Sequence, residues 1–157
     1  MTVIIAITGA LAVLGLAVIF GADVVGVLVQ RSVYADLDDR TLVQVVGRGH
    51  LYADRRMPAV GIPATILTAL TAAAAFLWGT TLSGILSTVG LVLLVAWLLV
   101  YARLAKPINT ALTAAALADE VPADARALQA RWDSLLPLRV VLNGITIALL
   151  AATLFLV

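Results

Sequence analysis

"PAVGIPATILTALTAAAAFLWGTTLSGILSTVGLVLLVAWLLVY", residues 58–101, contains no acidic, basic or histidine side chain. It holds two apolar runs, residues 58–78 and 82–101, which are joined through the short uncharged segment "GTTLSG". Each run is close to the roughly 20 residues that a helix needs to cross the hydrocarbon core of a bilayer. Because lipid offers no partner to free backbone N–H and C=O groups, both runs must be helical. We therefore predict an antiparallel pair of membrane-spanning helices joined by a tight turn.

Two further apolar runs, residues 3–29 and 138–157, lie toward the ends of the chain. Of the 157 residues, 63% are hydrophobic and only 12% are charged, whereas a soluble domain is about 25% charged. A soluble protein of this size does not bury so much apolar surface. The fold class that we predict is an all-α integral membrane protein, a four-helix transmembrane bundle in which residues 1–157 form a single membrane domain.

The basic residues indicate how the bundle is oriented. All ten Lys and Arg residues lie in or beside the two long connections, residues 30–57 and 102–137. The positive-inside rule makes these connections cytoplasmic, so both termini are expected outside. The same residues are too scattered for a nucleic-acid-binding surface. Cysteine is absent, which excludes disulfides and thiolate metal sites.

The two long connections are themselves expected to be helical and interfacial. Asp38 or Asp39 is a suitable N-cap for a helix that starts near Arg40. The third span is expected to continue to about Ala118 after a bend at Pro107. A further helix starts after residue 122, and Pro137 is expected to break it before the fourth span.

Several motifs carry a resemblance to a known family. They are Pro107 and Asn109 in "KPINTAL", Trp132 in "LQARWDSLLPLR", and Arg139 at the start of the last span. With these residues in this order over essentially the whole chain, the protein resembles the small four-span bacterial membrane proteins of unknown function related to the fungal anthrone oxygenases. Many members have a histidine two residues before the arginine that matches Arg139, where this chain has Pro137.

The resemblance implies a multi-pass protein of the bacterial inner membrane. It also implies that the protein oxygenates or oxidises a lipophilic aromatic or quinol-like molecule, which comes from the bilayer into the cytoplasmic half of the bundle. Such a reaction removes an acidic proton and lets the resulting anion react with dioxygen without a metal. No cofactor is therefore predicted.

His50 is the only histidine of the chain and our first candidate for the catalytic base, because its ordinary pKa lies near 6.5. Asp54 follows four residues later, on the same helix face, where a carboxylate orients an imidazole and raises its basicity. The alternative is a solvated interfacial histidine with an incidental acidic neighbour. One His and one Asp are too few for a usual metal site, so a metal at His50 is unsupported.

Asp23 and Arg139 are the remaining candidates for catalysis. A lone carboxylate inside a span costs at least about 2.5 kcal/mol on insertion scales, so it usually faces the bundle interior and pairs. Arg55, Arg56 and Arg139 are the candidate partners. Structural and functional roles for Asp23 both remain open. In a dry site, Arg139 or Arg56 is expected to stabilise a substrate anion.

Other polar side chains are expected to join a substrate-binding or structural cluster. Asn109 and Asn143 suit hydrogen bonds between helices, and Asn143 shares a face with Arg139 at i, i+4. Trp132 is most simply an aromatic anchor at the membrane interface. The same interpretation applies to other aromatic residues near the span ends, namely Tyr34, Tyr52, Trp97 and Tyr101.

Two classes of function follow from these residues. One is an oxygenase or oxidoreductase that acts on a lipophilic small molecule. The other is a non-enzymatic accessory, lipid-binding or assembly subunit of a membrane complex. A transporter ranks last, because the chain shows no inverted repeat or broken-helix pair. The expected partners are the bilayer, a lipophilic small molecule, and further copies of the chain or other subunits.

Overall fold

The computed structural model describes residues 2–156, which fold into helices joined by short turns. Four helical stretches are long and apolar enough to cross a membrane, which confirms the predicted number of spans. Their bounds are Thr2–Ala35, Pro58–Trp78, Thr81–Ala118 and Ala125–Leu154. The elements within and between them are α1 (Thr2–Val25), η1 (Gly26–Gln30), α2 (Arg31–Ala35), α3 (Asp39–Arg56), α4 (Pro58–Trp78), α5 (Thr81–Val100), η2 (Tyr101–Ala105), α6 (Lys106–Ala118) and α7 (Ala125–Leu154).

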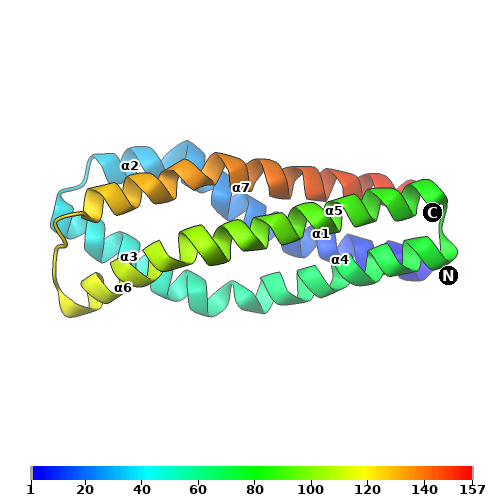
Figure 1. Cartoon of the computed structure of the whole chain (residues 1–157), viewed down its shortest axis with the longest axis horizontal. Coiled ribbons are helices and arrows are strands. Elements are labelled where there is room, and N and C mark those ends of the chain that lie inside the picture. Colours follow the sequence, from blue (N-terminus) through cyan, green and yellow to red (C-terminus); the bar gives the residue numbers. More distant parts are fainter. Residues whose placement is uncertain (1, 157) are drawn as a thin grey trace.

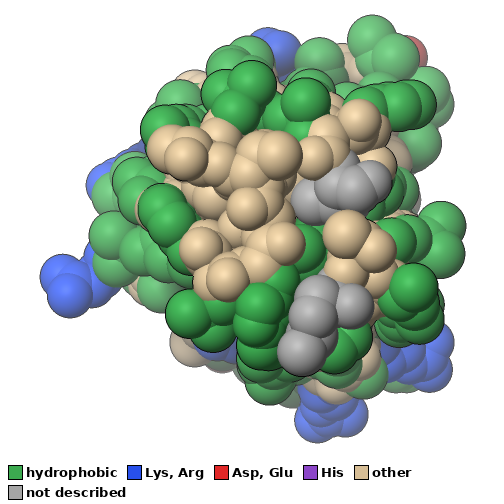
Figure 2. Space-filling model, turned by 90° about the vertical axis from the view of Figure 1, so that its right-hand side faces the viewer, with side chains coloured by type: hydrophobic (Ala, Val, Ile, Leu, Met, Phe, Trp, Pro, Cys, Tyr) green, Lys and Arg blue, Asp and Glu red, His purple; other side chains and the backbone are tan. Residues whose placement is uncertain are grey.

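The long helices lie side by side along the long axis of the molecule (Figure 1). α1 packs against α4 and α7, and α5 packs against the same two helices. Both termini and the α4–α5 turn lie at one end, called here the terminal end (Figure 1). The other end, called the charged end, consists of α2, α3, α6 and the first turns of α7. Seen end-on, the terminal end shows hydrophobic and uncharged atoms, and the Lys and Arg side chains at the outline of the view belong to parts of the molecule farther from the viewer (Figure 2).

The α4–α5 hairpin is present as predicted, but its turn is shorter than the "GTTLSG" segment. α4 ends at Trp78 and α5 begins at Thr81. Thr80 is the N-cap of α5, because its hydroxyl accepts a hydrogen bond of 3.1 Å from the backbone N–H of Ser83. This cap satisfies one of the free N–H groups at the helix start and allows the chain to reverse over two residues.

Two π-helical segments interrupt the long helices near the charged end. In η1 the N–H of Arg31 donates to the carbonyl of Gly26, and in η2 the N–H of Lys106 donates to that of Tyr101. η2 ends two residues before Pro107, which has no N–H and whose ring would crowd the preceding turn of an α-helix. The helix then continues to Ala118, as predicted.

The predicted break at Pro137 is wrong. α7 runs without interruption from Ala125 to Leu154 and contains Pro137. A proline inside a helix removes one backbone hydrogen bond and costs about 3 kcal/mol or more. The packing of α7 along α1 and α5 holds the helix through this position. The predicted start of the last span at residue 138 therefore does not mark a helix end, and α7 begins at Ala125, after the short α6–α7 turn. Asp119 starts this turn with a left-handed φ of 56°.

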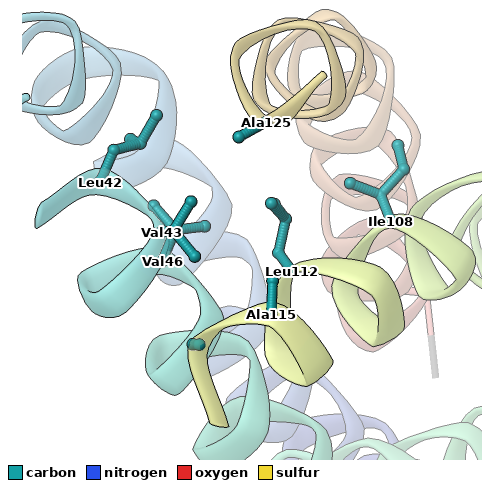
Figure 3. Packing of buried hydrophobic residues seen from close by; sticks show 8 residues of the cluster. Leu42, Val43, Val46, Ile108, Leu112, Ala115 and Ala125 are labelled. Carbon is teal, nitrogen blue, oxygen red and sulfur yellow. The ribbon is translucent and has the colours of Figure 1, made fainter. Parts of the chain in front are cut away.

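α3 forms as predicted and packs against α6. Asp38 is its N-cap and accepts a hydrogen bond of 3.0 Å from the N–H of Thr41. A Cβ added to Gly47 would lie 2.3 Å from the carbonyl oxygen of Leu112, so only glycine allows the two helices to approach so closely. Hydrophobic side chains from α3, α6 and the start of α7 fill the space between them (Figure 3). The members of this cluster are Leu42, Val43, Val46, Ile108, Leu112, Ala115, Ala116 and Ala125.

Candidate functional site

A cavity of about 600 Å³ lies where the long helices meet the charged end. This volume is within the usual range of sites for small molecules, about 300–1,000 Å³. Its wall contains six of the eight predicted site residues, namely Asp23, His50, Asp54, Asn109, Trp132 and Arg139. Arg56 and Asn143 are not part of the wall. The guanidinium of Arg56 is exposed and lies 5.0 Å from the ring centre of Tyr52.

Asp23 and Arg139 form a buried ion pair between α1 and α7, with 2.8 Å between carboxylate and guanidinium. Arg139 is thus the partner of Asp23 among the three predicted candidates. The indole N–H of Trp97 donates to the second carboxylate oxygen at 3.4 Å. The Arg139 guanidinium also lies 5.1 Å from the ring centre of Trp97 and 5.7 Å from that of Trp132. Two aromatic faces and one carboxylate therefore hold this cation in place.

Asp54 is the centre of a second polar cluster, which joins α3 to η2 and α6. Its carboxylate accepts hydrogen bonds from Tyr101 at 2.6 Å, Lys106 at 2.8 Å and Asn109 at 3.0 Å. Burial alone would raise the pKa of Asp54, but these three donors outweigh it and hold the pKa below its usual value. Among residues 2–156, Asp54 makes no hydrogen bond to His50. It affects His50 through its charge alone.

His50 is buried rather than solvated, with 7% of the residue exposed. Its ring lies 5.1 Å from that of Trp132, centre to centre. Burial lowers the pKa of His50 to about 4; the Asp54 carboxylate opposes this shift, and the positive charge of Arg139 adds to it. The imidazole is consequently neutral at pH 7. Its Nε2 atom has no hydrogen-bond partner in the part of the chain that the structure describes.

Unpartnered buried polar atoms are concentrated around the cavity. Within residues 2–156, five such atoms belong to its wall: His50 Nε2, Asn109 Oδ1, Gln129 Oε1, Trp132 Nε1 and Arg139 Nε. The amide nitrogens of Asn109 and Gln129 donate to Asp54 and Asp133, which leaves their oxygens free. An unpaired buried polar group costs about 1–3 kcal/mol, so such groups are rare and need an explanation. A hydrogen-bonding ligand in the cavity provides one.

Sequence reasoning misplaced or missed several residues of the site. Trp97 and Tyr101 were expected to be membrane-interface anchors, but Trp97 is only 6% exposed and both line the cavity. Their rings stack at 6.1 Å with 7° between the planes. The i, i+4 spacing of these aromatics was a usable signal. Gln129, three residues before Trp132 on α7, was also missed.

Asn143 lies outside the cavity wall and makes a hydrogen bond between helices. Its side-chain nitrogen donates to the carbonyl of Leu16 at 3.4 Å and so links α7 to α1. In residues 2–156, no three His, Cys, Asp or Glu side chains come together as a metal site would require. Comparisons with protein-family models, curated proteins and solved structures yield no match for this chain. The likeness to the anthrone oxygenases therefore stays a prediction from the sequence.

Proposed function

We propose that this protein binds a lipophilic aromatic molecule in the cavity and catalyses its oxygenation by dioxygen. The observation that carries the proposal is the set of five unpartnered buried polar atoms around a cavity whose other walls are largely apolar. Aromatic rings fill the apolar part of such a site, and hydroxyl and carbonyl groups on the rings bind the free donors and acceptors. The resemblance noted in the sequence independently favours this substrate class.

In the proposed reaction, the free Nε2 of His50 removes a proton from an acidic benzylic CH₂ group of the substrate. The neighbouring Arg139 stabilises the resulting anion, and the anion in turn raises the pKa of His50. The carbanion adds dioxygen to give a peroxide anion, which takes the proton back from His50. The hydroperoxide then loses water and leaves a carbonyl group. In balance, CH₂ and O₂ give C=O and H₂O, and His50 is regenerated.

For the membrane orientation, we propose that the charged end faces the cytoplasm of a bacterium and that both termini face outward across the inner membrane. The support is the concentration of all ten Lys and Arg residues in or beside the connections at one end. A periplasm-dependent alkaline phosphatase fused to the C-terminus tests this orientation. It should be active, whereas the same enzyme inserted after Glu120 should be inactive.

Anthrone in detergent micelles tests the oxygenation. Wild-type protein should consume dioxygen and form anthraquinone, as followed by an oxygen electrode and by absorbance. His50→Ala should abolish turnover and keep its helical circular dichroism. Arg48→Ala is the matched control, because Arg48 is exposed on the same helix and lies outside the cavity wall. Turnover retained by His50→Ala would remove the assigned base, and wild-type turnover equal to that of empty micelles would refute the reaction.

One observation favours a second function, that of a non-enzymatic lipid-binding or accessory subunit. Two carboxylates of the cavity wall are engaged in contacts that join helices. Buried Asp23 does so across α1, α5 and α7, and half-buried Asp54 across α3, η2 and α6. In this case Asp54→Asn destabilises the protein, and no variant differs from wild type in dioxygen consumption. Equal oxygen uptake together with a stable lipophile that copurifies would favour this alternative.

A further inference from the structure

The exposed part of the cavity wall is uncharged. The wall's charged and strongly polar residues are buried or half-buried, and none of them is exposed. These exposed residues are Ala22, Val25, Gly49, Met57, Pro58 and Ile62. Most of them belong to the facing parts of α1 and α4. The cavity therefore has a polar interior and an apolar mouth between these two helices.

Small residues mark where α1 touches α4 and where it borders open space at this mouth. Nearer the terminal end, a Cβ added to Gly15 would lie 2.8 Å from the Cβ of Ala64, so the helices are in close contact there. A Cβ added to Gly61 would lie 3.2 Å from Ile19, so α1 and α4 still touch there, whereas one added to Gly21 would meet nothing within 4 Å. Both Gly21 and Gly61 belong to the cavity wall. The cavity wall of α1 therefore borders open space at Gly21, beyond its contact with α4 at Gly61.

The mouth lies at the edge of the apolar zone. α4 has 21 residues, which at about 1.5 Å per residue match the roughly 30 Å of a hydrocarbon core. Pro58 and Ile62 are in the first turns of α4, and Arg55 and Arg56 end α3, with only Met57 between the two helices. A molecule that passes the mouth therefore comes from the level where lipid chains meet head groups.

We propose that the gap between α1 and α4 admits an amphipathic ligand sideways from the lipid phase. The ligand has an uncharged, hydroxylated or carbonyl-bearing aromatic head and one long apolar chain. The head binds the free polar atoms inside, and the chain remains in the mouth and extends into the bilayer. A charged head is disfavoured, because it would have to pass an apolar rim at high cost. This inference rests on the proposed function and specifies the form of its substrate.

A reversible block of the mouth tests this inference. The chain has no cysteine, so Ala22→Cys carries the sole thiol, which benzyl methanethiosulfonate converts to a bulky disulfide that dithiothreitol removes. The block is attached after folding. Ala10→Cys is the matched control, because Ala10 is exposed on the same helix and outside the cavity wall. Trp78→Phe is included in all variants, which leaves Trp97 and Trp132 beside the cavity as the fluorophores.

The probe is a decyl-substituted 1,4-benzoquinone in phosphatidylcholine vesicles that contain the protein, because quinones quench tryptophan fluorescence. Quenching should saturate, and the adduct on Ala22→Cys should raise the half-saturating probe content at least tenfold. Dithiothreitol should restore it, and the adduct on Ala10→Cys should leave it unchanged. Gly21→Leu should reproduce the loss without any chemical modification, since its side chain extends into the open mouth.

The failures of the two proposals are distinguishable. Saturable quenching that neither the Ala22→Cys adduct nor Gly21→Leu affects would overturn the lateral opening and leave ligand binding intact. Quenching that does not saturate in the unmodified protein would refute ligand binding, and with it both the proposed function and the opening.

Discussion

Buried polar groups are satisfied in different ways at the two ends of this molecule. Toward the terminal end, the hydroxyls of Ser87 and Thr153 each donate to the carbonyl four residues earlier in their own helix. At the charged end, Asp23 and Asp54 depend on donors from other helices, and five atoms of the cavity wall have no partner within residues 2–156. Because the two hydroxyls toward the terminal end are hydrogen-bonded within their own helices, they need no partner elsewhere in the protein and can be packed between helices. In the described part of the chain, the five unpartnered atoms of the cavity wall make no hydrogen bond that holds helices together, and a cluster of such atoms is typical of a binding site.

The largest effect is expected at the ion pair. Arg139→Leu leaves Asp23 buried without a counter-ion, so the free energy of unfolding should fall by about 3–5 kcal/mol. The double variant Asp23→Leu/Arg139→Leu should recover much of the loss, because no unpaired charge then remains. Unfolding by titration with sodium dodecyl sulfate in mixed micelles measures both values. A double variant as unstable as Arg139→Leu would show that the guanidinium acts through packing on Trp97 and Trp132 rather than through its charge.

The next effect is a pH dependence from His50. Its pKa in the folded protein is about 4, below the value of about 6.5 in the unfolded chain. The unfolded chain therefore binds more protons between these values, and stability should fall by up to about 3 kcal/mol as the pH drops from 6.5 to 4. Unfolding measured across this range in wild type and in His50→Asn isolates the contribution. Parallel pH profiles for the two proteins would contradict a buried neutral imidazole.

Two glycines of α3 distinguish the effect of close helix packing from that of helix propensity at the charged end. Gly47→Ala forces α3 away from the Leu112 carbonyl and should lower stability by about 1–3 kcal/mol. Gly49→Ala meets nothing within 4 Å and should raise it by up to about 1 kcal/mol, because alanine is the better helix former. Thermal denaturation followed by circular dichroism compares the two. The same sign for both substitutions would contradict the close approach of α3 to α6.

The smallest effect is expected at the terminal end. Ser87→Ala removes a hydroxyl that is bonded only within its own helix, to Ser83 and Gly84. Hydrogen bonds of side chains in membrane bundles contribute about 0.6 kcal/mol on average, and a bond within one helix should contribute no more. The same titration in mixed micelles measures this change. A loss as large as that of Arg139→Leu would abolish the distinction between the two ends.

The fold was largely predictable because hydropathy and charge are properties of single segments. The four apolar stretches, the cap at Asp38 and the end of α6 at Ala118 follow from local composition. The pairing of Asp23 was predictable as well, since a lone carboxylate in a span requires a partner. The continuity of α7 through Pro137 was not, because the local cost of a proline is offset by tertiary packing that the sequence does not display.

The candidate site was predictable only in part. His50, Asp54 and Arg139 stand out because titratable groups are scarce in so apolar a chain. Trp97 was misjudged because an aromatic near the end of a span has the same local sequence whether it faces lipid or the bundle interior. The burial of His50 was also hidden, since it depends on the contact with Trp132, which lies on another helix.

The hydrophobic cluster between α3 and α6 (Figure 3) forms a second core at the charged end, separate from the cluster between the long helices. The 38 residues from Thr81 to Ala118 extend about 57 Å, nearly twice the thickness of the hydrocarbon core. With the spans in a bilayer, as proposed above, we expect this cluster to lie in water and to be held together by the hydrophobic effect, whereas the spans contact lipid. Urea should therefore unfold the packing of α3 against α6, which includes Val46 of the cavity wall, while the helices in the membrane stay folded. One chain would then unfold in two stages, the first in its water-exposed part and the second in its lipid-exposed part.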